Sequence, residues 1–200
     1  MIDEAVAAIR AGEPVVLPTD TVYGLCADPS REGPAREVAR LKGREERQPT
    51  ALLVRDVDLL LEYVPELRAH AAPVRALLPG PLTLILPNPA RRHRWLTGDN
   101  PEAIGVRVPE LNGPGAEVLG RVGAVLATSA NRHGGPDPRR LDEVPEEIRR
   151  GCAALVDGGE LPGTPSTVLD LTGPEPRVLR EGAIPAAEAL ERLLGATAGG

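Results

Sequence analysis

The fold is decided by the stretch Pro14-Val15-Val16-Leu17-Pro18-Thr19-Asp20-Thr21, in which a short apolar run opens into a polar turn. The apolar run predicts a buried strand over residues 14–17. An amphipathic helix is predicted before it, over residues 2–11, and another after it, over residues 34–41, where Gly43 ends it. Short strands that alternate with helices indicate an α/β domain.

The rest of the sequence repeats this alternation in short units. Further strands are predicted at residues 51–54, 82–86, 104–108, 124–128, 153–156, 167–171 and 178–180, and further helices at 57–64, 67–78, 116–121, 141–150 and 185–194. Several strands follow one another too closely for a helical crossover, which favours a mixed sheet. No linker divides the chain, so we expect one domain over residues 1–194 and a frayed tail over 195–200.

The composition excludes several classes of protein. With a formal net charge of −6 over 200 residues, the chain has no overall positive field that would recruit nucleic acid. No apolar run is long enough to cross a bilayer, and the first residues lack a signal-peptide pattern. Cys26 and Cys152 lie far apart and form no CxxC motif. We therefore expect reduced thiols in a cytoplasmic protein that makes no contact with a membrane.

Several familiar catalytic motifs are also missing. No GxxxxGK[ST] loop and no GxSxG elbow occurs, so neither a P-loop nor a hydrolase triad is predicted. The three histidines form no HxxxH or HExxH pattern, and no carboxylates have the spacing of a catalytic metal centre. No metal site built by the protein alone is predicted.

Lysine and glutamine are each used once. Lys42 and Gln48 are the sole residues of their types, although lysine and arginine together number 23. A chain that uses arginine for almost every cation keeps one lysine by chance, or because a compact ammonium is needed in place of a planar guanidinium. Composition alone leaves these two explanations equal.

Polar side chains gather in segments that follow predicted strands or end a helix. The turn at 18–21 and Tyr23 follow the first strand, Lys42-Gly43-Arg44 ends a helix, and Thr128-Ser129-Ala130-Asn131 closes the strand at 124–128. Strand ends in α/β sheets carry ligand sites, and these groups suit phosphate oxygens, so the segments favour an anion-binding pocket. The alternatives are an ordinary Asp/Thr turn with Tyr23 in the core, and cations that stabilise a helix C-terminus.

Two further segments contain candidate residues. Arg107 lies in a predicted strand that is otherwise apolar, and a buried guanidinium needs an anionic partner, either an internal carboxylate or a ligand. Ser166 lies in Gly163-Thr164-Pro165-Ser166-Thr167, and Arg180 lies in Leu179-Arg180-Glu181-Gly182. Two of the three serines and the sole lysine therefore fall inside the polar segments, and the sole glutamine follows Lys42-Gly43-Arg44 in the short segment Gln48-Pro49-Thr50.

Taken together, these segments resemble the YrdC-like family, the threonylcarbamoyl-AMP synthases of tRNA modification. They occur in the family's order across nearly the whole chain: PTDTVYGL at 18–25, KGR at 42–44, LPGPLTLIL at 78–86, RWLTG at 94–98, GVRVP at 105–109, TSAN at 128–131, DGG at 157–159, PSTV at 165–168 and LREGA at 179–183. The KxR and SxN elements are the most specific of these matches.

The resemblance implies a twisted open mixed β-sheet flanked by helices, with a large concave cavity. It implies a nucleotidyltransferase that joins L-threonine, bicarbonate and ATP into L-threonylcarbamoyl-AMP and releases pyrophosphate, with Mg²⁺ on the phosphates. A separate threonylcarbamoyl transferase complex would then modify tRNA. We expect any direct contact of this chain with tRNA to be weak.

The resemblance also assigns roles to single residues. Lys42 and Arg44 are the expected catalytic residues. Threonine is expected to bind to Thr21, Arg107, Thr128 and Ser166, and ATP to Lys42, Arg44, Gln48, Ser129, Asn131 and Arg180. Such a reaction needs positioning and cationic stabilisation of phosphate charge rather than a covalent intermediate, which agrees with the missing triad.

The sequence departs from the family at single positions. Asp20 stands where many members have Glu, and Leu53 where some have a histidine that contacts threonine. Asp137 falls near a serine that contacts ATP in some members, and that role is not transferred to it. The alternative to an enzyme is a non-catalytic paralogue of the same fold that binds nucleotide or RNA. An acidic chain with one Trp, two Tyr and no Phe disfavours RNA.

Overall fold

A mixed β-sheet forms the centre of the computed structural model, which describes residues 1–197. Among those residues the sheet has nine strands in the order β7-β1-β2-β6-β3-β5-β4-β8-β9. The strands are β1 (Val15–Pro18), β2 (Tyr23–Ala27), β3 (Ala51–Val54), β4 (Leu82–Pro87), β5 (Ala103–Arg107), β6 (Ala124–Ser129), β7 (Ala154–Leu155), β8 (Thr167–Asp170) and β9 (Arg177–Arg180). The helices are α1 (Ile2–Ala11), α2 (Glu32–Lys42), α3 (Val57–Tyr63), α4 (Ala71–Leu77), α5 (Gly113–Val122), α6 (Glu146–Gly151) and α7 (Ala186–Thr197), with the 3-10 helices η1 (Pro65–His70), η2 (Arg94–Leu96) and η3 (Leu141–Glu143).

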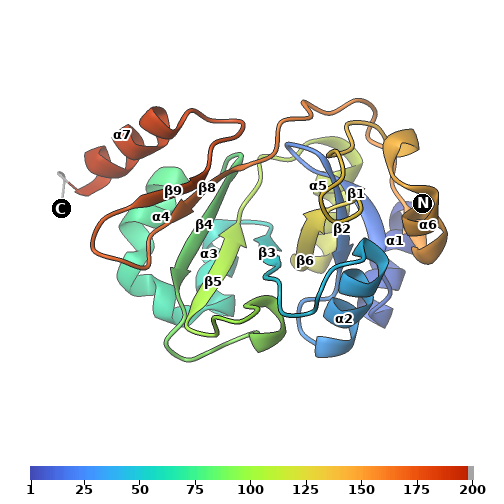
Figure 1. Cartoon of the computed structure of the whole chain (residues 1–200), viewed down its shortest axis with the longest axis horizontal. Helices are drawn as coiled ribbons and strands as arrows, with labels where there is room; N and C mark the ends of the chain where they lie inside the picture. The colour runs from blue at the N-terminus through green and yellow to red at the C-terminus, as the bar shows by residue number, and fades with distance from the viewer. Residues whose placement is uncertain (198–200) are drawn as a thin grey trace.

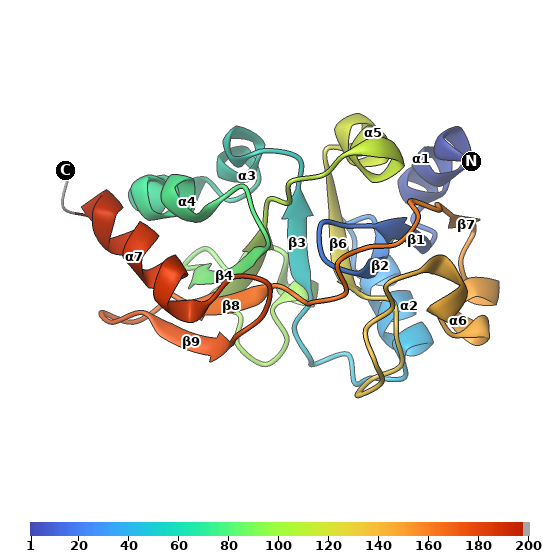
Figure 2. The same ribbon diagram turned by 90° about the horizontal axis from the view of Figure 1, so that it is seen from above.

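Parallel and antiparallel pairs are mixed across the sheet. β3 pairs in parallel with β5 and antiparallel with β6, so this central strand has one neighbour of each orientation. Figure 1 shows β3 in the middle, with β1, β2 and β6 on one side and β4, β5, β8 and β9 on the other. The view in Figure 2 shows that the strands turn strongly in direction from β3 to β9. The predicted fold, a twisted mixed sheet flanked by helices, is confirmed.

The two faces of the central strands have different surroundings. Leu52, Leu84 and Val106 lie in the larger apolar cluster, which also contains the buried side chains of α3 and α4. Thr83 and Arg107 alternate with them on the opposite face and line a cavity. At the β1–β2 end, α1 and α5 pack on the sheet in a second apolar cluster. The sheet is therefore enclosed at one end and hollowed on one face near its middle.

Strand β2 differs most from the sequence-based expectation, which placed only a polar turn and Tyr23 in this region. All five of its residues are buried, and β2 pairs antiparallel with both β1 and β6. A strand that is buried on both faces shows no alternation of polar and apolar residues, so periodicity does not reveal it. The structure thus shortens the turn to the residues between Pro18 and Tyr23.

Two predicted helices are each divided in the structure. The helix expected at 67–78 is η1 followed by α4, and the one expected at 141–150 is η3 followed by α6. Pro73 lies in the first turn of α4 and Pro145 directly before α6, because proline lacks the N–H that a helix interior requires. At the other end of the chain, α7 runs to Thr197, beyond the predicted end at residue 194. The remaining tail, 198–200, lies outside the described residues.

The two cysteines are free thiols. Cys26 is buried and Cys152 is half-buried. Burial raises the pKa of both thiols to about 12, so neither forms an appreciable thiolate at neutral pH. Within residues 1–197, no helix combines the length and apolar character needed to cross a membrane.

Candidate active site

A cavity of about 210 Å³ lies on the face of the sheet opposite Leu52 of β3 and Leu84 of β4. Its walls come from the β1–β2 turn, from strands β3 to β6, and from the segments before β8 and in β9. Six of the predicted site residues line it: Thr21, Arg107, Thr128, Ser129, Ser166 and Arg180. Residues as far apart in sequence as Thr19 and Arg180 therefore meet at one site.

The turn between β1 and β2 is held by its own hydroxyl groups. Thr19 Oγ1 donates to the Val22 carbonyl at 2.7 Å and accepts from the backbone N–H of Thr21 at 3.2 Å. The hydroxyls of Thr19 and Thr21 lie 3.1 Å apart, within hydrogen-bond distance. Because both side chains are buried, this local network presents Thr21 to the cavity in one orientation.

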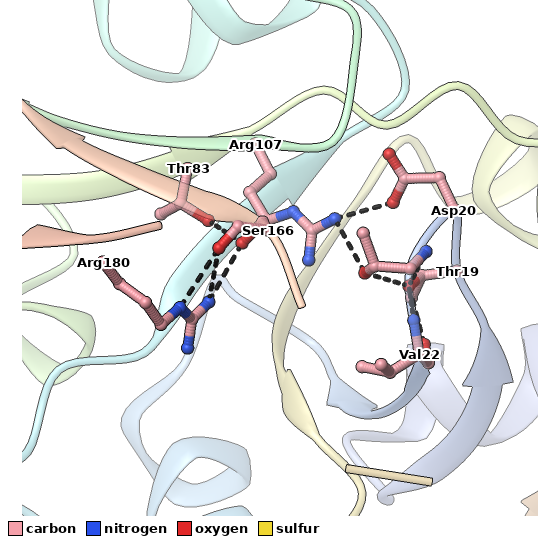
Figure 3. A network of polar contacts seen from close by, with 8 residues as sticks. Thr19, Asp20, Val22, Thr83, Arg107, Ser166 and Arg180 are labelled. Atoms are coloured by element: carbon pink, nitrogen blue, oxygen red, sulfur yellow. Dashed lines mark hydrogen bonds and ion pairs between the residues drawn. The ribbon is translucent and has the colours of Figure 1, made fainter. Parts of the chain in front are cut away.

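Arg107 makes a buried ion pair at the cavity wall. Its Nη2 donates to Asp20 Oδ1 at 2.6 Å and to Thr21 Oγ1 at 3.3 Å (Figure 3). The two side chains of the pair are only 11% and 6% exposed. Burial lowers the pKa of Arg107 and raises the pKa of Asp20, because each charged group loses its hydration. The opposite charge of the partner compensates for only part of that loss. The internal carboxylate that a buried guanidinium requires is therefore Asp20.

This ion pair leaves donor capacity free. Arg107 Nε is buried without a hydrogen-bond partner, and so is Asp20 Oδ2. Buried polar atoms without partners are uncommon in folded proteins and indicate that a ligand, a water or strain accounts for them. A guanidinium that is fixed at one nitrogen and has a free N–H group is suited to bind an anion.

Ser166 forms the centre of a second network on the other side of the cavity. Its Oγ lies 2.7 Å from Thr83 Oγ1, and its carbonyl accepts from Nε and Nη2 of Arg180 at 3.1 and 2.8 Å. Figure 3 shows Arg180 reaching towards Ser166 while Arg107 reaches towards Asp20. Arg180 has no carboxylate partner in the described part of the chain, and its positive charge contributes to the lowered pKa of Arg107. Two guanidinium groups therefore meet at the cavity, and only that of Arg107 is paired with a carboxylate among the described residues.

Lys42 and the Thr128–Asn131 segment form the third group. Lys42 Nζ donates to the Ser129 carbonyl at 2.7 Å, to the Asn131 carbonyl at 3.1 Å and to Asn131 Oδ1. Ser129 Oγ donates to Asn131 Oδ1 at 2.7 Å. Burial lowers the pKa of Lys42 to about 8, with a smaller contribution from Arg44. The lone lysine is therefore a buried ammonium held by oxygens next to the cavity.

Arg44 and Gln48 lie further from the cavity than expected. Arg44 donates to the Pro49 carbonyl at 3.2 Å and to Thr50 Oγ1, and its Nε is buried without a partner. It lines a neighbouring pocket that shares Thr50 with the main cavity. Burial lowers its pKa to about 10. Gln48 does not line the main cavity, and the structure gives its side chain no partner there.

Sequence reasoning left four polar cavity residues without a role: Thr19, Thr50, Thr83 and Asp137. Thr19 lies within the polar turn, Thr83 within the LPGPLTLIL segment, and Asp137 at the position where the serine role was not transferred. Asp137 is the carboxylate among the cavity-lining residues. Thr83 has no local sequence signal, because only the pairing of β4 with β8 brings it next to Ser166.

Residues 7–182 match the family Sua5/YciO/YrdC, whose description is "Telomere recombination". The chain belongs to this family. The resemblance seen in the motifs is thereby confirmed. The roles assigned to single residues stay predictions.

The chain is similar to curated proteins in sequence and to solved structures in fold. The threonylcarbamoyl-AMP synthase of Stenotrophomonas maltophilia is 36% identical over 78% of this chain and 86% of its own length. The crystal structure of Pyrococcus abyssi Sua5 complexed with L-threonine matches with a TM-score of 0.84 and 33% identity, over 97% of this chain and 57% of the Pyrococcus chain. Escherichia coli YciO matches with a TM-score of 0.78 and 26% identity, over 94% and 91% of the two chains.

Proposed function

We propose that this chain is an L-threonylcarbamoyl-AMP synthase, a nucleotidyltransferase that uses L-threonine, bicarbonate and ATP. The observation that carries this function is one cavity with an anion-binding guanidinium at Arg107 and, beside the same wall, a buried ammonium at Lys42 held by Ser129 and Asn131. The relatives named threonylcarbamoyl-AMP synthase and the threonine-bound Sua5 structure support it.

Different cationic groups of the site would bind the two substrates. Arg107, with Nε free, would bind the threonine carboxylate, and Thr21 and Ser166 would contact the amino acid from either side. Lys42, Ser129 and Asn131 would face the phosphates, together with Arg44 from the neighbouring pocket. Thr128 and Arg180 also line the cavity, where Thr128 would contact threonine and Arg180 would contact the nucleotide. Gln48 contacts ATP in this proposal only if the 44–50 segment moves.

The reaction then needs no covalent enzyme intermediate. Bicarbonate takes up a proton and loses water to give CO₂. The amine of threonine attacks the carbon of CO₂ and releases a proton, which gives a carbamate. A carbamate oxygen attacks the α-phosphorus of ATP, and pyrophosphate leaves with the electrons of the broken P–O bond. Cationic side chains in a partly buried site stabilise the developing phosphate charge, and positioning supplies much of the remaining rate enhancement.

Magnesium fits this cavity as a companion of ATP. Within residues 1–197 no group of three or more His, Cys, Asp or Glu side chains is arranged to hold a metal ion. Mg²⁺ commonly keeps several waters and binds through substrate phosphates and one or two carboxylates, so a preformed cage is not required. The ion would supply positive charge on the leaving phosphates. The product would pass to a separate transferase that modifies tRNA.

Pyrophosphate release tests the proposed function. The purified chain is incubated with ATP and Mg²⁺, and threonine and bicarbonate are added separately and together. We expect release only when both are present. ATP binding without release would favour the non-catalytic paralogue, and absence of ATP binding would contradict the assignment.

A matched pair of variants tests whether threonine binds in the cavity. Arg107→Gln removes the proposed carboxylate ligand and should raise the KM for threonine roughly 10–100-fold, because a charge-assisted hydrogen bond contributes about 1.5–3 kcal/mol. Arg177→Gln removes an exposed guanidinium of β9 that pairs with Asp170. This control should leave the KM unchanged, and equal effects of both variants would show that charge alone matters.

A further inference from the structure

Asp137 is an acidic side chain in a cavity that is otherwise lined by neutral and basic groups. It stands between Pro136 and Pro138, and the Pro138 carbonyl accepts from the backbone N–H of Tyr23 at 2.9 Å. Asn131 Nδ2 donates to Asp137 Oδ1 at 3.2 Å. Two prolines and a backbone contact to β2 therefore hold the carboxylate at the cavity wall without an ion pair in the described part of the chain.

The carboxylate lies beside the groups proposed to bind phosphate. Asn131 connects the two, because its Oδ1 accepts from Lys42 and its Nδ2 donates to Asp137. The charge of Asp137 also raises the pKa of Lys42 against the larger effect of burial. A triphosphate bound at Lys42 would thus lie near a negative charge. The negative charges of the triphosphate and of Asp137 would repel each other unless a cation lies between them.

A purely structural role does not explain the charge. Asn131 Nδ2 already donates to the Gly135 carbonyl at 2.6 Å, which is shorter than its contact with Asp137. A neutral serine or asparagine at 137 could accept the longer hydrogen bond equally well. Oδ2 of Asp137 has no hydrogen bond in the described part of the chain and remains free to bind a ligand.

We propose that Asp137 is the protein ligand of the magnesium ion that accompanies ATP, binding it through the free carboxylate oxygen. This inference rests on the proposed function only in that ATP occupies the cavity. Mg²⁺ is a hard cation that prefers oxygen ligands and is commonly held by one or two carboxylates together with substrate phosphates. The side chain that repels metal-free ATP would then attract the magnesium complex.

Calorimetric titration with ATP, without threonine or bicarbonate, measures the repulsion of metal-free ATP and the attraction of its magnesium complex separately. We compare the wild-type protein, Asp137→Asn, and Asp58→Asn, which removes a carboxylate from the exposed surface of α3. In the wild type and the α3 control, Mg²⁺ should tighten ATP binding by about tenfold or more. In Asp137→Asn the Kd for Mg·ATP should rise and the Kd for ATP in EDTA should fall, so the advantage of magnesium disappears.

The opposite changes of the two Kd values identify a metal ligand. Loss of a contact to the ribose, or a local rearrangement of the loop, would weaken both forms of ATP alike and would overturn the proposal. Unchanged Kd values for Asp137→Asn would overturn it as well. Urea unfolding of the variant shows whether the fold is kept.

A spectroscopic measurement tests the contact directly. Mn²⁺ replaces Mg²⁺, and its electron paramagnetic resonance spectrum is recorded with ATP in the wild type and in Asp137→Asn. We expect the bound-Mn²⁺ signal of the ternary complex to weaken or change shape in the variant, and identical spectra would overturn the proposal. If the Asp137-dependent signal is present but pyrophosphate is never released, the proposed function fails while the metal site stands.

Discussion

Lys42 is the position at which this arginine-rich chain keeps an ammonium. Its Nζ contacts the backbone oxygens of Ser129 and Asn131 at 2.7 and 3.1 Å, with the Asn131 side chain as a further acceptor. These oxygens surround a compact donor, whereas a guanidinium is planar and longer. The packing favours the chemical explanation for the single lysine over chance.

Substitution of this lysine should change the pH dependence of ATP binding. The pKa of Lys42 is lowered by burial to about 8, so the ammonium loses its proton above that pH in the free protein. Above pH 8 we expect the affinity for ATP to fall by about tenfold per pH unit until the pKa of the complex is reached. Lys42→Arg should bind ATP weakly at every pH and lack this slope. Calorimetry at several pH values checks this, with Arg40→Lys on the same helix as control.

Stability of the ligand-free protein should respond in the opposite direction. The unfolded chain keeps the Lys42 proton up to about the ordinary pKa of 10.5, and the folded chain only to about 8. Between these values the unfolded state binds more protons, so the contribution of Lys42 to the free energy of unfolding rises with pH. Urea unfolding at pH 8 and pH 10, relative to Lys42→Arg, measures it. A difference that falls with pH would contradict the assigned shift.

At the scale of elements, the start of β8 and the segment before it are held by the segment after β9. The Gly182 N–H donates to Thr167 Oγ1 at 2.9 Å, and the Ala183 N–H donates to the Pro165 carbonyl at 2.9 Å. A Cβ atom on Gly182 would lie 2.1 Å from the Pro165 carbonyl oxygen and 2.7 Å from the Ser166 carbonyl carbon. The close crossing of these two segments therefore places Ser166 and Arg180 at the cavity.

Gly182→Ala should separate the two segments and weaken the site. Because the new methyl group would meet backbone on the facing segment, we expect a loss of about 1–3 kcal/mol of stability. Threonine affinity should fall by roughly tenfold or more, since the displaced Ser166 lines the cavity. Gly173→Ala, in the β8–β9 connection, is the matched control because its Cβ would lie 3.8 Å from the nearest atom. Calorimetry with threonine and urea unfolding test both variants, and similar results for the two would refute the argument.

At the scale of the molecule, charge favours a small anionic substrate over a nucleic acid. The net charge is −6, and the exposed arginines along the helices pair largely with carboxylates, as Arg36 does with Glu32 and Arg40 with Glu37. Positive groups without a carboxylate partner, such as Lys42, Arg44 and Arg180, lie in or beside the cavity. These three cations bring positive charge to a site that suits phosphate and carboxylate groups.

Binding of tRNA should accordingly be weak and unspecific. We expect a Kd no tighter than about 10⁻⁶ M at physiological salt, the range of non-specific nucleic-acid binding. Fluorescence anisotropy with labelled tRNA over a series of salt concentrations measures it. Sub-micromolar affinity with a steep dependence on salt would instead support the RNA-binding alternative.

The sequence by itself determined the elements whose signals are local. Helix α1 at Ile2–Ala11 and strand β3 at Ala51–Val54 have the predicted bounds, because caps, breakers and short apolar runs lie within the elements themselves. The sequence also indicated an anion-binding pocket, since rare residue types gathered after strand ends. It missed β2, whose burial on both faces removes the periodic signal.

Tertiary structure alone decided which of these residues meet. The partner of Arg107 is Asp20, 87 positions away, and Thr83 reaches Ser166 only through the pairing of β4 with β8. The same packing brings Asp137 to the phosphate side and leaves Gln48 outside the cavity lining. Strand order and register arise from burial of apolar surface summed over the whole chain, and one local segment contains too little of that information to specify them.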